Sequence, residues 1–288
     1  MKASDLKQIF HNELNAQYGK EEVESFFFLS MEHYLNVPRI QLALDSEYTV
    51  SKKELDTFFS LLDELKDDKP IQYIFGETEF YGLKFKVNKN VLIPRQETEE
   101  LVDWIISEYK SHNSKFRILD IGTGSGCIAI SLAKHLPNAE VFALDVSTDA
   151  LEIAKNNAKL NSVDIQYIEA DILNAKSFSL DFKDYEFDII VSNPPYVRHL
   201  EKEEIKANVL DYEPHLALFV DDNDPLLFYK SITRFAVNKL KQNGHLYFEI
   251  NQYLGEETKD LLTESDLTDI ELRKDLNGND RMLKAIKK

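Results

Sequence analysis

The chain has 288 residues, of which 43% are hydrophobic, and this composition excludes an intrinsically disordered protein. Its 34 Lys and Arg against 51 Asp and Glu give a formal net charge of −17, which argues against a nucleic-acid substrate, although a local positive patch is compatible with it. One cysteine, Cys127, excludes an intrachain disulfide and a thiolate zinc cluster, and no apolar run approaches the ~18 residues of a membrane span.

The N-terminus is charged and has no apolar signal core, so we expect a cytoplasmic protein with no membrane contact. The first 70 residues have the pattern of a small helical bundle, because apolar residues recur at helical spacing between residues 6 and 14. In "SKKELDTFFSLLDELK", Ser51 and Glu54 have the spacing of a capping box and predict the start of a helix. Residues 71–93, "IQYIFGETEFYGLKFKVNKNVLI", contain short β-like runs between glycines and predict a β-hairpin linker.

Helices and strands alternate in the remainder of the chain, residues 94–288. A helix in "ETEELVDWIISEYK" is followed by a strand in "FRILDIG", a helix in "CIAISLAKHLP" and a strand in "AEVFALDVS". Later strands are expected in "DIQYIEAD", "FDIIVS", "HLYFEI" and "RMLKAI". This rhythm is typical of an α/β fold with a doubly wound, mostly parallel sheet.

A glycine-rich turn, "GTGSG", joins the first of these strands to its helix. Gly122, Gly124 and Gly126 allow the backbone to approach a ligand, and the helix start offers free N–H groups. In the dinucleotide fingerprint the third glycine lies three positions after the second, whereas Gly126 lies two positions after Gly124. The lysine of a phosphate-binding P-loop is also absent from the sequence.

Two carboxylates follow at the ends of the next strands. Asp145 is placed to accept hydrogen bonds from both hydroxyls of a ribose, and Asp171 lies where an adenine would be. The ligand that fits the loop and both carboxylates is an adenosine without a pyrophosphate, namely S-adenosylmethionine. Spacing alone leaves an alternative open, in which an ordinary tight turn is followed by two carboxylates that cap helices.

The stretch "DIIVSNPPY" ends a strand in a stiff elbow, because two consecutive prolines lack N–H groups and have fixed φ angles. Asn193 and Pro194 offer two carbonyl acceptors that would hold the hydrogens of a planar NH₂ group and align its lone pair with a methyl group. Tyr196 would stack on that group, and no strong base is needed if the proton leaves after the transfer. The alternative is a Pro-Pro strand terminator whose asparagine caps a turn.

An Asn-Pro-Pro-Tyr elbow behind "DIGTGSG" resembles the class I amino-methyltransferases, which act on DNA adenine, RNA guanine or protein glutamine. Residues 70–102, "YEPHLALF" (212–219) and "KDLNGNDRML" (274–283) are similar to the HemK-type protein-(glutamine-N5) methyltransferases. The resemblance extends over about residues 20–285. Two departures are Gln96, where that family usually has proline, and "FEINQYLG", which lacks a glycine after the isoleucine.

The resemblance implies a class I, Rossmann-like methyltransferase domain at 94–288, a helical substrate-binding domain at 1–70 and a hairpin linker at 71–93. It also implies transfer of a methyl group from S-adenosylmethionine to the glutamine amide in the Gly-Gly-Gln loop of class 1 peptide chain release factors, which would tune translation termination. The expected partner is therefore a protein, with no direct nucleic-acid contact and no metal, and we expect a monomer.

Site residues follow from the same resemblance. Asn193, Pro194 and Tyr196 would be catalytic, and together with Pro195 they would bind the substrate amide. Phe80 and residues 93–99 would close the crevice, and Cys127 is interpreted as an inert small residue. The cofactor-binding residues would be Gly122, Thr123, Gly124, Ser125, Gly126, Asp145, Asp171, Ile172 and Asn193.

Three other functions are weighed against this hypothesis. A DNA or RNA amino-methyltransferase needs a basic groove, which the net charge disfavours. If the protein bound the cofactor without catalysis, we would expect a broken glycine loop or a different residue in place of Asn193. The glycine loop and Asn193 are both present. A nicotinamide-dependent dehydrogenase has a different glycine spacing.

Overall fold

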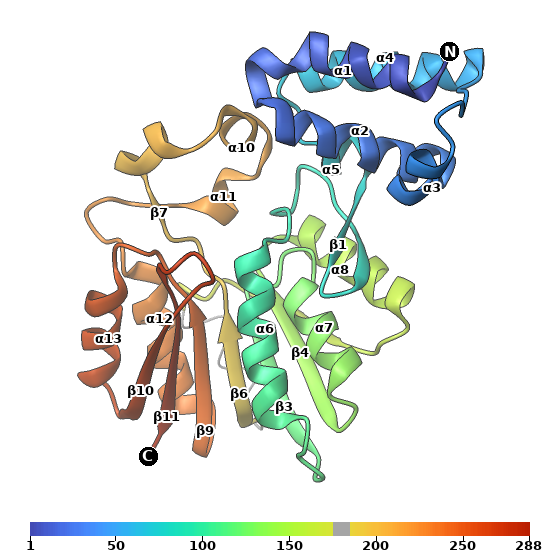
Figure 1. The fold of residues 1–288 in the computed structure, drawn as a ribbon. Coiled ribbons are helices and arrows are strands. Elements are labelled where there is room, and N and C mark those ends of the chain that lie inside the picture. Colours follow the sequence, from blue (N-terminus) through green and yellow to red (C-terminus); the bar gives the residue numbers. More distant parts are fainter. Residues whose placement is uncertain (175–184) are drawn as a thin grey trace. The chain divides into compact units, whose positions relative to one another are not determined.

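The computed structural model describes residues 1–174 and 185–288, which form two compact units (Figure 1). The first unit combines Met1–Gly76 with a later segment, Ala207–Tyr212. The second consists of Glu77–Lys206 and Glu213–Lys288. No helix in the described ranges is both long and apolar enough to cross a membrane.

The first unit is helical, and its apolar side chains form a shared core that includes Leu6, Phe27 and Leu62. Phe10 packs edge-on against Phe27 and Phe58, with ring centroids 5.7 and 6.3 Å apart. The expected capping box at Ser51 and Glu54 is present at the start of its fourth helix. The helices are α1 (Ala3–Tyr18), α2 (Lys20–Leu35), α3 (Arg39–Leu44), α4 (Lys52–Lys66), α5 (Ile71–Phe75) and α10 (Ala207–Tyr212).

Residues 71–93, expected as a hairpin linker, contribute to both units. Ile71–Phe75 form helix α5 of the first unit, whereas β1 (Glu77–Phe80) and β2 (Leu83–Lys86) form an antiparallel hairpin of the second. The hairpin is fixed to α8 (Thr148–Asn161) by two buried asparagines. Asn157 exchanges hydrogen bonds with the backbone of Lys86, and Asn161 donates to the carbonyl of Lys84.

A seven-stranded sheet forms the centre of the second unit, in the order β10-β11-β9-β6-β3-β4-β5. The five strands from β9 to β5 are parallel, and β11 and β10 are antiparallel to their neighbours. This arrangement confirms the predicted doubly wound, mostly parallel α/β fold. The strands are β3 (Phe116–Ile121), β4 (Ala139–Asp145), β5 (Gln166–Glu169), β6 (Phe187–Ser192), β9 (Leu240–Glu249), β10 (Leu267–Lys274) and β11 (Asp280–Lys287).

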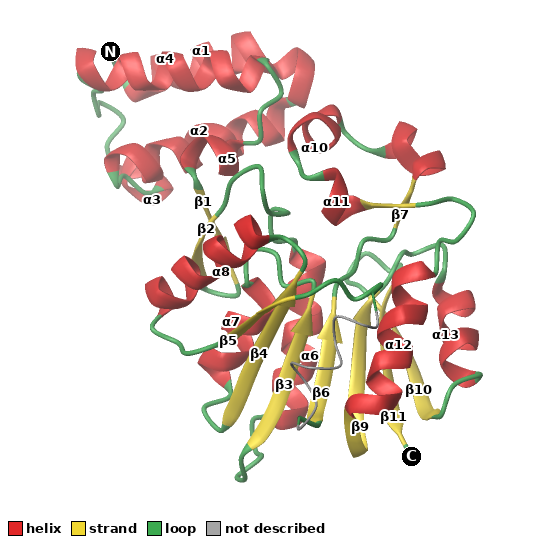
Figure 2. Ribbon diagram, turned by 180° about the vertical axis from the view of Figure 1, so that it is seen from behind, coloured by secondary structure: helices red, strands yellow, loops and turns green. Residues whose placement is uncertain are grey.

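Helices cover both faces of this sheet. Helices α6 (Gln96–Tyr109), α7 (Cys127–His135) and α8 lie over the face seen in Figure 1, and α12 (Leu227–Lys239) lies over the face seen in Figure 2. Helix α13 (Gly255–Thr263) packs beside β10. The remaining short elements are β7 (Val197–Arg198), a 3₁₀ helix (His199–Glu204), α11 (His215–Leu218) and β8 (Phe219–Val220).

Because β3, β4 and β6 are parallel neighbours, their carboxyl ends meet at one edge of the sheet. The register pairs Ile121 at the end of β3 with Leu144 of β4 and Ser192 of β6. The glycine turn, Asp145 and the elbow at Asn193 therefore begin side by side, which is the position where open α/β sheets bind ligands.

Candidate active site

A cavity of about 400 Å³ opens at this edge of the sheet, a volume in the range of small-molecule sites, ~300–1,000 Å³. It brings together most of the predicted cofactor residues and three residues of the elbow. These are Gly122, Thr123, Gly124, Ser125, Asp145, Asp171, Ile172, Asn193, Pro194 and Pro195.

The glycine turn forms the wall of the cavity between β3 and α7. All three glycines have positive φ, at +75° for Gly122, +54° for Gly124 and +83° for Gly126. Gly126 is not among the described residues that line the cavity. A Cβ atom there would lie 2.9 Å from Ile130 Cδ1 and 3.1 Å from Ala154 Cβ, so this glycine permits close packing between α7 and α8.

Asp145 lies at the end of β4 and fixes the glycine turn. Its Oδ2 accepts a hydrogen bond from the N–H of Gly124 at 2.8 Å, and its Oδ1 accepts one from Ser147 N at 2.9 Å. Burial raises the pKa of this carboxyl, and backbone hydrogen bonds from Ser147, Gly124 and Val146 lower it. Asp145 also lines the cavity, and its contact with the hydroxyls of a ribose stays a prediction.

The elbow after β6 presents Asn193 to the cavity with a defined amide orientation. The Asn193 Nδ2 donates to Thr98 Oγ1 at 3.2 Å, so the amide nitrogen is used within the protein. Asn193 and Pro194 both line the cavity, and each carries a carbonyl oxygen that can accept hydrogen bonds. That these two carbonyl groups hold the NH₂ group of a substrate stays a prediction.

Two aromatic residues named by the sequence analysis lie outside the cavity lining. Tyr196 packs against the core beneath the elbow, and its hydroxyl donates to Glu249 Oε1 at 3.0 Å. Its contact with the substrate amide stays a prediction. The expectation for Phe80 is wrong, because this side chain is 1% exposed and packs edge-on against Phe85 in the hairpin.

Sequence reasoning missed the carboxylate that joins two segments of the cavity wall. Glu213, buried at 4% exposure, accepts a hydrogen bond from Ile93 N at 3.1 Å and forms an ion pair with Arg95. The two segments are more than 100 positions apart, and both Arg95 and Pro214 line the cavity. Arg95 directly precedes Gln96, the first residue of α6 and the position where the sequence analysis noted the absence of a proline. Glu213 therefore restrains the loop in front of this position.

Cys127 lines the cavity at the start of α7, but burial raises the pKa of its thiol to about 12. It is therefore a thiol at neutral pH, which fits the interpretation as an inert small residue. Among residues 1–174 and 185–288, no group of His, Cys, Asp and Glu side chains is arranged to hold a metal ion.

Asp120, directly before the glycine turn, is a fully buried carboxyl. Its Oδ2 accepts hydrogen bonds from Thr123 Oγ1 at 2.6 Å and from Ala129 N at 3.3 Å, and burial raises its pKa to about 7. When the pKa of a carboxyl is higher in the folded than in the unfolded protein, its contribution to stability is fully present at pH values below the unfolded-state pKa. This contribution is lost as the pH rises toward the folded-state pKa. The relevant window is therefore from the ordinary value of 3.8 to about 7.

We expect the wild type to lose stability relative to Asp120→Asn as pH rises through this window, by at most about 1.4 kcal/mol per pH unit. Urea unfolding of both proteins without ligand between pH 5 and 8 measures the difference. Asp149→Asn, which removes an exposed carboxylate from the start of α8, is the matched control. A difference between wild type and Asp120→Asn that is independent of pH would show that Asp120 is ionised throughout.

Comparison with known proteins identifies the family of this chain. A model described as "Methyltransferase small domain" matches residues 100–212, and one described as "PrmC N-terminal domain" matches residues 10–76. The release factor glutamine methyltransferase of Flavobacterium psychrophilum is 55% identical over 96% of this chain and 96% of its own length. The chain belongs to the release factor glutamine methyltransferase family.

The protein of the same name from Bacteroides thetaiotaomicron is 42% identical over 93% of this methyltransferase and 94% of its own length. A solved structure, the catalytic domain of hMettl16 in complex with an RNA hairpin, covers 73% of this chain and 76% of its own, with a TM-score of 0.56. Its 18% identity shows the fold alone. The resemblance to HemK-type enzymes, the class I fold and methyl transfer as the activity are thus confirmed.

Proposed function

We propose that this methyltransferase transfers a methyl group from S-adenosylmethionine to the side-chain amide nitrogen of the glutamine in the Gly-Gly-Gln loop of class 1 peptide chain release factors. The observation that carries the proposal is the presence of Asn193 and Pro194 together in the cavity lining, with the Asn193 Nδ2 donating to Thr98 Oγ1 so that Oδ1 is the group this side chain can offer to a ligand. A planar amide NH₂ is the group that this pair of carbonyl acceptors fits. Family membership supports the choice of glutamine.

The cofactor is assigned to the half of the cavity between the glycine turn and β4. Asp145 would accept hydrogen bonds from the ribose, and the segment Asp171–Ile172 would flank the adenine. Thr123 and Ser125, both buried, would line the methionine part with the turn backbone. When bound, S-adenosylmethionine supplies the methyl group, whose bond to sulfur breaks as its bond to the amide nitrogen forms.

The elbow would act on the amide in two ways. Asn193 Oδ1 and the Pro194 carbonyl would each accept one N–H, which turns the nitrogen lone pair toward the cofactor. The same two dipoles would stabilise the positive charge that develops on nitrogen during the transfer. The proton then leaves to solvent, so no general base is assigned. The fixed φ angles of Pro194 and Pro195 keep the acceptors in place before the substrate arrives.

Three further assignments accompany this proposal. The helical unit would recognise the release factor, since exposed apolar side chains such as Ile40 and Leu44 lie on its surface, at 65% and 83% exposure. The chain would act as a monomer in the cytoplasm, where translation takes place. A nucleic-acid base as the methyl acceptor is the alternative, and the net charge of −17 argues against it.

Incubation with radiolabelled S-adenosylmethionine and an unmethylated class 1 release factor is expected to place one methyl group on the Gly-Gly-Gln glutamine, as located by peptide mass mapping. A factor with alanine in place of that glutamine is the control and should receive no label. Transfer to RNA or DNA in parallel reactions, with none to the factor, would overturn the substrate assignment while leaving the methyltransferase activity intact.

A further inference from the structure

Glu249, at the end of β9, is a buried carboxylate that the chemistry above does not use. It is 1% exposed and is not among the described residues that line the cavity. It accepts two hydroxyl hydrogen bonds, from Thr98 Oγ1 at 2.6 Å and from the phenol of Tyr196 at 3.0 Å. Thr98 accepts a hydrogen bond from Asn193 and Tyr196 belongs to the elbow, so Glu249 is linked to both ends of the elbow.

The hydrogen bonds from Asn193 to Glu249 run in one direction. The Thr98 hydroxyl donates its single proton to Glu249 Oε2 at 2.6 Å. The Thr98 oxygen must then accept from its other neighbour, and it does so from Asn193 Nδ2 at 3.2 Å. If the Asn193 amide were reversed, its oxygen would face an oxygen that has no proton left to donate.

A second residue after β9 holds the backbone of the same elbow. Asn251, 4% exposed, donates through Nδ2 to the carbonyl of Tyr196 at 2.9 Å and to Glu201 Oε2 at 2.9 Å. Glu201 in turn pairs with Arg198 at 2.6 Å. Asn251 is the residue that stands where the family more often has glycine, and it does not line the cavity. The end of β9 thus fixes both the side chains and the main chain of the elbow.

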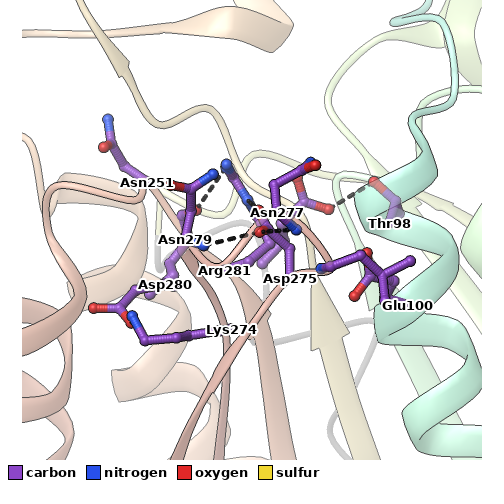
Figure 3. Close-up of polar contacts among 12 residues, drawn as sticks. Thr98, Glu100, Asn251, Lys274, Asp275, Asn277, Asn279, Asp280 and Arg281 are labelled. Atoms are coloured by element: carbon purple, nitrogen blue, oxygen red, sulfur yellow. Dashed lines mark hydrogen bonds and ion pairs between the residues drawn. The ribbon is translucent and has the colours of Figure 1, made fainter.

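Burial and a neighbouring positive charge act in opposite directions on the pKa of Glu249. Burial raises the pKa of Glu249, whereas Thr98, Arg281 and Tyr196 lower it and the nearby Glu97 raises it. Arg281 is held in place by Asp275 at 3.1 Å and by the carbonyl of Ile250 at 3.3 Å (Figure 3). These contacts give a role to the 274–283 stretch, which the proposed chemistry does not otherwise involve.

We propose that Glu249 is a positioning residue for methyl transfer, which acts through the Thr98 hydroxyl to keep Asn193 Oδ1 directed at the substrate amide. This inference rests on the proposed function. It predicts that removing either Glu249 or the Thr98 hydroxyl leaves the binding of both substrates nearly unchanged but lets the Asn193 amide rotate. The effect should therefore appear in kcat rather than in KM.

The test compares Thr98→Val and Glu249→Met, which remove the hydrogen bonds at similar side-chain volume, with wild type in the release-factor assay. Each is expected to lower kcat by about 10- to 100-fold, with KM values near those of wild type. The double variant should lose no more than the worse single variant, because both changes break the same chain of hydrogen bonds.

Two conservative variants and one control separate positioning from general destabilisation. Thr98→Ser keeps the hydroxyl, and Glu249→Gln keeps one acceptor for it, so both should retain most of the wild-type kcat. Glu108→Met removes another carboxylate that accepts a tyrosine hydroxyl, from Tyr247 at 2.6 Å, and it should leave kcat unchanged. Thermal unfolding of all variants reports the loss of stability independently.

The outcomes distinguish the inference from the function on which it rests. A wild-type protein that does not methylate the factor would refute the proposed function. A wild type that is active, together with Thr98→Val at the wild-type kcat or with losses that add in the double variant, would overturn the role of Glu249. Thr98→Val only replaces a hydroxyl group by a methyl group of similar size, so it still tests the inference if Glu249→Met does not fold.

Discussion

Asn193→Ala is expected to lower kcat for glutamine methylation by about 10²–10³-fold, the loss typical of removing one preorganised dipole at a centre of developing charge. The substitution removes the Oδ1 acceptor and leaves only the Pro194 carbonyl for two N–H groups. The NH₂ group of the substrate glutamine would then be free to rotate, and its nitrogen lone pair would no longer be aligned with the methyl group of the cofactor. Single-turnover methylation of a release factor measures the effect on chemistry.

The affinity of Asn193→Ala for S-adenosylmethionine should change much less, because the residues proposed to bind the ribose and the adenine are Asp145 and Asp171. Calorimetric titration of Asn193→Ala with S-adenosylmethionine checks this point. Asn223→Ala, which truncates an exposed asparagine bonded to Asp221, is the matched control and should be fully active. Asn193→Ala with kcat near that of wild type would show that the elbow is a Pro-Pro strand terminator whose asparagine only caps a turn.

Gly126→Ala is expected to reduce the free energy of unfolding by about 2–5 kcal/mol, as the sum of left-handed backbone strain of ~1–2 kcal/mol and overpacking of ~1–3 kcal/mol. At φ +83°, the new methyl group would lie 2.9 Å from Ile130 Cδ1 and 3.1 Å from Ala154 Cβ. Ile130 Cδ1 is the end of a flexible side chain and can move aside, but Ala154 Cβ is fixed to the backbone of α8, so that helix would have to shift by a few tenths of an ångström. This loss is a large part of the ~5–15 kcal/mol that stabilises a typical protein.

Gly124→Ala is the matched control within the same turn. Gly124 also has positive φ, at +54°, but a Cβ atom there meets nothing within 4 Å, so only the backbone strain of ~1–2 kcal/mol applies. Urea unfolding without cofactor compares the two variants, so effects on ligand binding do not enter. Equal stabilities would show that the helices give way and that Gly126 is not required for their packing.

The sequence predicted those parts of the site that depend on local pattern. The glycine turn, Asp145 and Asn193 each follow directly from a buried strand, and parallel strands bring such positions to one edge of the sheet. The fold class and the family followed from the same local features and from motif spacing. The capping box at Ser51 was also predicted from adjacent residues, because a helix cap depends only on residues three positions apart.

The sequence did not predict the contacts that hold the site in place. Thr98 and Glu249 are 151 positions apart, and Arg95 and Glu213 are 118 positions apart. No periodicity in a single sequence indicates such pairs, since each depends on how distant elements pack. Phe80 was misplaced for the same reason, because an aromatic residue in a hairpin can face a core or a cavity. Asn251 was noted as a departure in the sequence, but only the coordinates show that it binds the elbow.

The division of the chain between the two units has a consequence for synthesis on the ribosome. The helical unit includes Ala207–Tyr212, whose Tyr212 hydroxyl donates to the carbonyl of Asp67 at 2.7 Å. A nascent chain of 76 residues therefore lacks one helix of its first unit, and that helix emerges only after strands β3 to β6 have been made. We therefore expect the N-terminal unit to begin folding first and to gain this helix only when most of the second unit has been translated.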